Sequence, residues 1–186
     1  MKKESSVTHD VIMLGIGGKG VLLAGQLLVR AGINQYKHVL YFPEYGVFKR
    51  GGFSHCYVIL SDKEIASPLF DQSEALIVFE PSILVTCQDQ VLPGGAIVVE
   101  SAGLNTKVQR SDIRFVSVPA VETAAKMGNP QVANLILLGA YVRTCEAVSP
   151  QLVEAELDKM LAGKAKALAL NKEAFHKGCE LGAAKP

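Results

Sequence analysis

Residues 11–28 read VIMLGIGGKGVLLAGQLL, and this stretch contains a strand, a glycine turn and the start of a helix. Val11–Leu14 are consecutive apolar residues, the pattern of a short strand buried on both faces. The glycine-rich turn Gly15–Gly20 follows, and apolar residues then recur at helical spacing over residues 20–33. A strand that passes through a glycine turn into a helix predicts the first unit of an α/β sheet.

Strands and helices continue to alternate along the chain. In this prediction Pro43 ends the second strand, Pro93-Gly94-Gly95 end the second helix, and Asn171 caps the last helix. The alternation predicts an α/β fold with a Rossmann-like, mostly parallel sheet flanked by helices and closed by C-terminal helices. The expected strands cover 11–14, 38–42, 54–60, 75–79, 96–99 and 113–118, and the later helices cover 81–91, 121–127, 131–146, 149–161 and 171–181.

Length and composition limit the class of protein. With 186 residues, of which 49% are hydrophobic, the chain is expected to form a single domain over 1–186, with residues 1–9 as a disordered tail. The formal net charge of +1 argues against a nucleic-acid partner, and the longest uncharged run, 128–142, is too short for a membrane helix. Residues 11–60 nevertheless carry five basic residues against one acid, whereas 61–100 carry seven acids against one base. We expect the acidic residues to form a solvated face or a subunit contact.

Local motifs for a metal site or a catalytic nucleophile are absent from the sequence. The four cysteines form no CxxC pair, and the four histidines are scattered without ligand spacing. No signal peptide is apparent, so the thiols are expected to be reduced core residues of a cytoplasmic protein. The sequence therefore predicts neither a metal site nor catalytic residues in this chain.

The Gly15–Gly20 turn is a candidate anion site, because helix-end amides and the helix dipole attract negative charge. It fits the dinucleotide pattern GxGxxG, with Glu44 placed 24 residues after Gly20 where an acid would hold a ribose hydroxyl. It does not fit a Walker A motif, because Val21 follows Gly20. The alternative is that the glycines serve only the packing of helix against strand.

A second candidate segment follows the second expected strand. It contains the adjacent cations Lys49 and Arg50 and the glycine pair Gly51 and Gly52. In a doubly wound sheet this loop lies near the first glycine turn, so both segments could face one phosphate group. The alternative is that the two cations are solvated surface charges.

Together these motifs resemble the gamma subunit, or gamma-type domain, of the 2-oxoacid:ferredoxin (acceptor) oxidoreductases, and the resemblance runs nearly end to end. That family usually reads GxGGQG at the first turn and YGPExRGG at the second segment. Lys19 here replaces the glutamine, which adds positive charge, and residues 47–48 replace Pro-Glu. The further matching segments are Ser67-Pro68, Gly128-Asn129-Pro130 with Asn134 and Leu138-Gly139-Ala140, and Asn171 with Ala174 and Gly178.

The resemblance implies an enzyme complex that oxidatively decarboxylates a 2-oxoacid to an acyl-coenzyme A. Thiamine diphosphate and iron–sulfur clusters would belong to alpha and beta, and in some members delta, partner subunits, and ferredoxin would accept the electrons. This chain, inactive alone, would contribute to coenzyme A binding and assembly. The binding residues that the resemblance implies are Gly15, Gly17, Gly18, Lys19, Gly20, Lys49, Arg50, Gly51, Gly52 and Asn134.

Other interpretations stay open at this point. Asn134 lies in an apolar helix, where it could instead bridge buried backbone. The chain could be a stand-alone NAD(P)-binding protein that uses the glycine turn and Glu44, or only an assembly scaffold. A homodimer is an option for the isolated chain, and the sequence does not decide among 2-oxoacid substrates.

Overall fold

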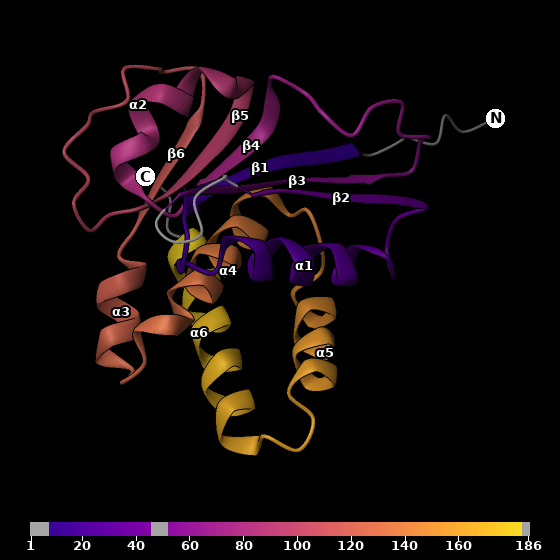
Figure 1. Ribbon diagram of the computed structural model, residues 1–186, viewed down its shortest axis with the longest axis vertical. Helices are drawn as coiled ribbons and strands as arrows, with labels where there is room; N and C mark the ends of the chain where they lie inside the picture. The colour runs from indigo at the N-terminus through magenta and orange to yellow at the C-terminus, as the bar shows by residue number, and fades with distance from the viewer. Residues whose placement is uncertain (1–7, 46–51, 184–186) are drawn as a thin grey trace.

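A single mixed sheet organises the chain (Figure 1). The computed structural model describes residues 8–45 and 52–183, and within them six strands follow the order β2-β3-β1-β4-β5-β6. β1, β4, β5 and β6 pair in parallel, whereas β3 is antiparallel to both β1 and β2. The predicted α/β class and mostly parallel sheet are confirmed, with β3 as the strand of opposite direction. The strands are β1 Thr8–Ile16, β2 His38–Tyr45, β3 Phe53–Ser61, β4 Ser73–Val78, β5 Val91–Glu100 and β6 Arg114–Val118.

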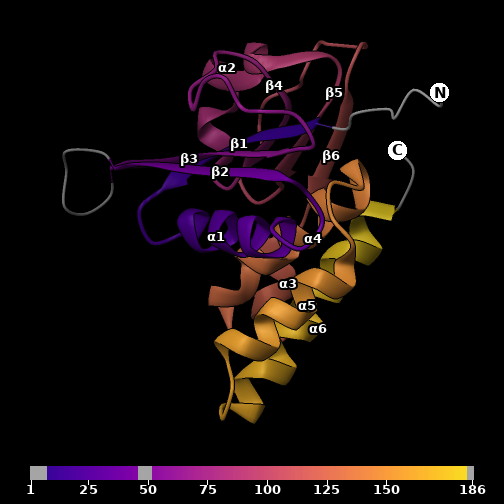
Figure 2. The same ribbon diagram turned by 90° about the vertical axis from the view of Figure 1, so that its right-hand side faces the viewer.

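The helices cover the two faces of the sheet unequally (Figures 1 and 2). α1 packs along β3, and α4, α5 and α6 lie on the same side, whereas the short α2 and segment 101–113 cover the other face. Within the described residues, no helix is long and apolar enough to span a membrane. The helices are α1 Val21–Gly32, α2 Leu84–Cys87, α3 Ala120–Lys126, α4 Ala133–Cys145, α5 Pro150–Met160 and α6 Ala165–Ala183, and 3-10 turns cover Pro81–Ile83, Gln88–Gln90 and Pro130–Val132.

The core lies on both faces of β1, the third strand in the sheet order. Val11 and Met13 pack into the larger cluster beneath α1 and α4, while Ile12 and Leu14 pack into the smaller one beneath α2. This two-sided burial explains why the first strand reads as a continuous apolar run. It also fixes the position of the turn that leaves the strand at its carboxyl end.

Two predictions near strand ends are wrong. Pro43 does not end the second strand, because β2 is the edge strand and a proline without an N–H is tolerated where no further strand pairs. Thr8 and His9, expected in a disordered tail, are the first residues of β1. Thr8 pairs with Ser61 of β3, and their hydroxyl oxygens lie 3.0 Å apart.

Two helix predictions also need correction. The expected helix 81–91 is a short α2 between two 3-10 turns, and Pro93-Gly94-Gly95 lie inside β5. The β4–β5 register shifts there, because the irregular backbone of these residues forms a bulge. The last helix begins at residue 165 instead of 171, since the alanine-rich segment before Asn171 is itself helical. Asn171 therefore caps nothing, and its side chain donates to the Ala167 carbonyl at 2.7 Å.

Candidate functional site

The glycine turn connects the carboxyl end of β1 to α1, and its backbone requires glycine at two positions. Gly18 and Gly20 adopt φ values of 91° and 74°, in the left-handed region that L residues with a side chain seldom enter. A Cβ on Gly20 would lie 2.5 Å from the Asn134 amide nitrogen, whereas a Cβ on Gly18 would meet nothing within 4 Å. Gly15 serves packing, since its Cβ would lie 2.7 Å from a Val21 methyl group. The turn thus combines helix–strand packing with open space beside Gly18.

The first turn of α1 presents the positive end of the helix dipole. The helix begins with Gly20 as its N-cap, and no side chain caps it. The first turn also holds no acidic residue, so its amides keep their electropositive character. A helix start with these features favours an anion.

Asn134 holds this turn from the side of α4. It is 4% exposed, and its amide donates to the Gly20 carbonyl at 3.3 Å while its oxygen accepts from the Leu135 amide at 2.9 Å. Both polar atoms of the side chain therefore have backbone partners. These contacts agree with the interpretation in which Asn134 bridges buried backbone groups, and they position the turn against α4.

The second glycine segment meets the first at Gly52. The Gly17 amide donates to the Gly52 carbonyl at 3.0 Å, and Ile16 pairs with Phe53 where β1 and β3 end side by side. Gly52, the last residue of the second glycine segment, and the start of β3 thus lie beside the turn. Lys49, Arg50 and Gly51 lie outside the described residues.

Glu80, which the sequence analysis did not select, pairs with Lys19 of the turn. The Lys19 ammonium lies 3.5 Å from a Glu80 carboxylate oxygen, and Glu80 also accepts hydrogen bonds from the Ser82 amide and hydroxyl. Burial raises the pKa of Glu80, but the Ser82 hydrogen bonds and the Lys19 charge outweigh it, so the pKa lies below its ordinary value. The strand pairing explains this contact, because Glu80 follows β4, the parallel neighbour of β1, at the same edge of the sheet.

Glu100, at the end of the expected acidic face, is buried instead of solvated. It is 1% exposed and accepts hydrogen bonds from the Ala102 amide at 2.7 Å and the Val121 amide at 2.9 Å. Val121 lies in the first turn of α3, so the carboxylate stabilises the positive end of that helix. Glu100 thus fixes the connection that follows β5.

Glu44 is not placed to hold a ribose hydroxyl beside the turn. Its carboxylate lies 2.8 Å from the His55 ring nitrogen, across the β2–β3 pairing. In a dinucleotide-binding sheet the acidic residue ends the strand next to β1, but here β3 separates β2 from β1. The strand order therefore argues against the NAD(P)-binding interpretation.

The thiols and histidines give no sign of a catalytic or metal centre. Burial raises the pKa of Cys56 to about 12 and that of Cys87 to about 11, so both thiols stay protonated near neutral pH. In the part of the chain that the structure describes, no group of three or more His, Cys, Asp or Glu residues could hold a metal ion. His9, His55 and His176 each pair with a glutamate.

Comparisons of sequence with known proteins give one consistent result. A family model described as pyruvate ferredoxin/flavodoxin oxidoreductase matches residues 10–181. The ketoisovalerate oxidoreductase subunit VorA of Methanothermobacter thermautotrophicus is 30% identical over 171 residues, which cover 91% of this chain and 35% of VorA. The chain thus spans about a third of that relative's length.

Solved structures share the fold over nearly the whole chain. The gamma subunit of a keto/oxoacid ferredoxin oxidoreductase from Geobacter sulfurreducens has a TM-score of 0.79 and 28% identity, covering 95% of this chain and 97% of that one. A 2-oxoglutarate:ferredoxin oxidoreductase from Magnetococcus marinus, with 2-oxoglutarate, coenzyme A and succinyl-CoA bound, has a TM-score of 0.85 and 22% identity. The match covers 96% of this chain and 32% of the Magnetococcus chain. At that identity the second likeness concerns the fold alone.

Proposed function

The chain belongs to the pyruvate ferredoxin/flavodoxin oxidoreductase family, and from this premise we propose that it is the gamma subunit of a 2-oxoacid:ferredoxin oxidoreductase. The likeness to the Geobacter gamma subunit, which covers both chains almost completely, supports this assignment. The complex would oxidatively decarboxylate a 2-oxoacid to an acyl-coenzyme A in the cytoplasm, and this chain alone would be inactive. The relatives include a ketoisovalerate and a 2-oxoglutarate enzyme, so we assign the substrate only as a 2-oxoacid.

Within that complex, alpha and beta subunits, with or without a delta subunit, would hold thiamine diphosphate and iron–sulfur clusters. These cofactors supply the decarboxylation and the electron transfer to ferredoxin. The proposed share of this chain is to bind the phosphate groups of coenzyme A and to complete the assembly. The Magnetococcus enzyme, which shares the fold, has coenzyme A bound.

The observation that carries the coenzyme A proposal is the hydrogen bond from the Gly17 amide to the Gly52 carbonyl at 3.0 Å. It joins the two glycine segments beside the uncapped first turn of α1, where an anion is favoured. The open space beside Gly18 would let a phosphate approach the backbone, and Lys19 would add a positive charge. The proposed site further includes Gly15, Gly20, Lys49, Arg50 and Gly51, with Asn134 as the residue that holds the turn.

Lys19 has a specific role in this proposal. Its present partner is Glu80 at 3.5 Å, a separation that is long for a charge-assisted hydrogen bond. The side chain is 36% exposed, so it can turn toward a phosphate at small cost. We propose that Lys19 exchanges Glu80 for a phosphate group of coenzyme A.

The first experiment tests the assembly. A tagged chain is expressed together with its neighbouring genes, and the subunits that copurify are analysed for thiamine diphosphate and iron–sulfur clusters. We expect both in the purified complex. Recovery of the chain without any thiamine- or cluster-binding partner would refute the gamma-subunit assignment.

The second experiment tests the coenzyme A site in the purified complex. Lys19→Ala should raise the KM for coenzyme A about ten-fold, the value of one charge-assisted hydrogen bond, and should leave the KM for the 2-oxoacid unchanged. Lys126→Ala is the matched control, because Lys126 pairs with Glu122 on the exposed surface of α3. Equal KM values for coenzyme A in both variants would refute the role of Lys19 while leaving the subunit assignment intact.

A further inference from the structure

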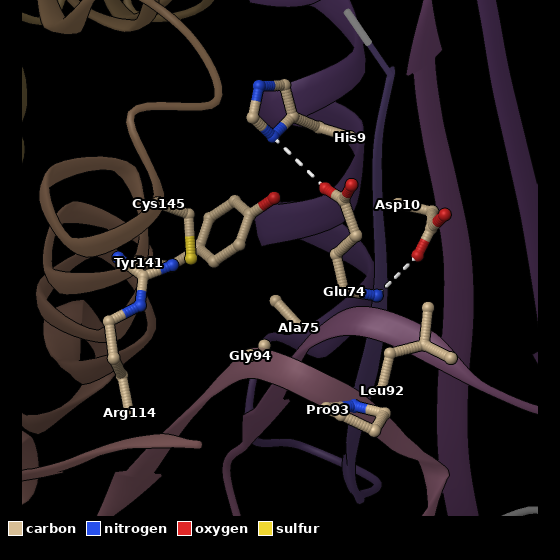
Figure 3. Close-up of a pocket in the computed structure, with 11 residues that line it drawn as sticks. His9, Asp10, Glu74, Ala75, Leu92, Pro93, Gly94, Arg114, Tyr141 and Cys145 are labelled. Atoms are coloured by element: carbon tan, nitrogen blue, oxygen red, sulfur yellow. Dashed lines mark hydrogen bonds and ion pairs between the residues drawn. The ribbon is translucent and has the colours of Figure 1, made fainter. Parts of the chain in front are cut away.

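A cavity with both polar and apolar lining residues lies at the opposite end of the sheet from the glycine turn (Figure 3). It has a volume of about 350 Å³ and opens where β1, β4, β5 and β6 begin. One wall is the bulge of β5 at Pro93-Gly94-Gly95, and the other is the C-terminal half of α4, with Tyr141 and Cys145. The volume is sufficient for a small organic molecule.

Two carboxylates stand at this cavity. An oxygen of Asp10 accepts a hydrogen bond from the Glu74 amide at 2.6 Å, and one carboxylate oxygen of Glu74 lies 3.3 Å from a His9 ring nitrogen. Burial, opposed by that backbone hydrogen bond, raises the pKa of Asp10, and the neighbouring Glu74 charge adds to the rise. Each carboxylate therefore uses one oxygen within the protein and has the other available.

Tyr141 directs a hydroxyl without a partner into the same cavity. Its side chain is 1% exposed, and Figure 3 shows the hydroxyl pointing from α4 toward Glu74. Among residues 8–45 and 52–183, no hydrogen bond to this hydroxyl is found. A hydroxyl that faces a cavity and has no partner in the protein can both donate to and accept from a molecule in that cavity. The hydroxyl is therefore available to a ligand.

Two basic side chains, Arg114 and His9, also line the cavity and each contacts a neighbouring group. Arg114 donates to the Thr144 carbonyl at 2.5 Å, at the negative end of the α4 dipole, and His9 pairs with Glu74. The acceptors that a ligand can use are the second oxygens of Asp10 and Glu74 and the lone pairs of the Tyr141 hydroxyl. The described residues offer no set of three His, Cys, Asp or Glu ligands for a metal ion. An ammonium group, with several N–H donors and a positive charge, matches these acceptors.

We propose that this cavity binds a small organic ammonium ion. The ammonium group donates hydrogen bonds to Asp10 and Glu74 and to the Tyr141 hydroxyl oxygen, and the apolar body lies against Leu92 and Pro93. The site lies at the other edge of the sheet from the proposed coenzyme A site and does not depend on that function.

Binding is measured on the full chain with phenethylammonium as the probe and 2-phenylethanol as its neutral counterpart. Backbone amide NMR shifts report where each probe binds, and titration gives the affinities. We expect the ammonium probe to shift residues around Asp10 and Glu74 and to bind at least about ten-fold more tightly than the alcohol. Equal affinities, or no shifts at these residues with about 10 mM probe, would overturn the proposal.

Variants separate a ligand role from a structural one. Asp10→Asn and Tyr141→Phe should each weaken binding of the ammonium probe about ten-fold. Tyr141→Phe should leave the melting temperature unchanged or raise it, because the hydroxyl loses no partner. Tyr57→Phe, on the opposite face of the sheet, is the matched control and should not alter binding. Unchanged affinity in Tyr141→Phe, or a lowered melting temperature, would contradict the assigned role of the hydroxyl.

Discussion

Replacement of Gly20 by alanine tests whether this glycine is required by both backbone conformation and packing. Its φ of 74° would cost an alanine about 1–2 kcal/mol, because the Cβ approaches the following carbonyl in the left-handed region. The new Cβ would also lie 2.5, 2.9 and 3.1 Å from the Nδ2, Cγ and Cβ atoms of Asn134. Since hydrogen bonds to the Gly20 carbonyl and the Leu135 amide hold the Asn134 side chain in place, this overlap adds about 1–3 kcal/mol.

We therefore expect Gly20→Ala to lower the free energy of unfolding by about 2–5 kcal/mol, or the melting temperature by about 10 °C for a chain of this length. Gly18→Ala is the matched control, because Gly18 has a φ of 91° but open space around its Cβ. Gly18→Ala should lower the free energy of unfolding only by the conformational cost of about 1–2 kcal/mol. Urea denaturation of both variants measures the difference.

A double-mutant cycle makes the test sharper. Asn134→Ala alone removes the hydrogen bond to Gly20 and should cost about 1–2 kcal/mol. In the Gly20→Ala and Asn134→Ala double variant the overlaps with Nδ2 and Cγ are removed and only the Cβ contact at 3.1 Å remains, so the combined loss should fall short of the sum by about 1–2 kcal/mol. Additive losses, or equal losses for Gly18→Ala and Gly20→Ala, would refute the contact between the turn and α4 as the reason for this glycine.

Three further outcomes are expected. Glu100→Ala should lower the free energy of unfolding by about 1–3 kcal/mol in urea denaturation, because the buried carboxylate accepts hydrogen bonds from the Ala102 and Val121 amides, and Glu122→Ala on the exposed surface should change it by less than about 0.5 kcal/mol. Gly178→Ala should cost more than about 2 kcal/mol in the same assay, because its Cβ would lie 2.1 Å from the Ile136 carbonyl oxygen in the α4–α6 contact. Burial raises the pKa of Cys56 to about 12, so this thiol supports stability below the unfolded pKa of about 9, and the support decreases as pH rises toward 12. Between pH 8 and 10 that loss is about 1.3 kcal/mol, and denaturation of Cys56→Ala at both pH values should show a correspondingly smaller decrease.

The sequence predicted the sheet well where local signals and burial agree. The continuous apolar run of β1 and the glycines after it identify the strand, the turn and α1 within a few residues. The prediction was wrong where tertiary context decides. Pro43 ends a strand by local rules, but β2 lies at the sheet edge and continues through it. Pro93-Gly94-Gly95 resemble a helix stop, yet they form the bulge that lets β5 pair with β4.

In the candidate site, too, local signals could be predicted from the sequence and tertiary contacts could not. The glycine spacing indicated the turn, and of the second glycine segment Gly52 lies beside it through the Gly17–Gly52 hydrogen bond. Neither Glu80 nor the unpartnered Tyr141 could be selected from the sequence. Glu80 reaches Lys19 only because β4 pairs in parallel with β1, and Tyr141 reads as one more apolar residue of α4. Both depend on contacts between segments that are far apart in the chain.

Although the net charge of the chain is only +1, the two ends of the sheet favour ligands of opposite charge. The turn at the carboxyl end of β1 presents helix amides and Lys19, whereas the amino end presents Asp10 and Glu74. Asp10 and Gly17 are separated along β1 and the start of the turn by about 23 Å, at about 3.3 Å per residue. Because charges are screened within about 8 Å at physiological ionic strength, the two sites should not influence each other electrostatically. Lys19→Ala should therefore leave the affinity for phenethylammonium unchanged, and Asp10→Asn should leave the KM for coenzyme A unchanged. If either variant changed both properties, the two sites would have to be coupled through the packing of β1, since charge alone does not act over that distance.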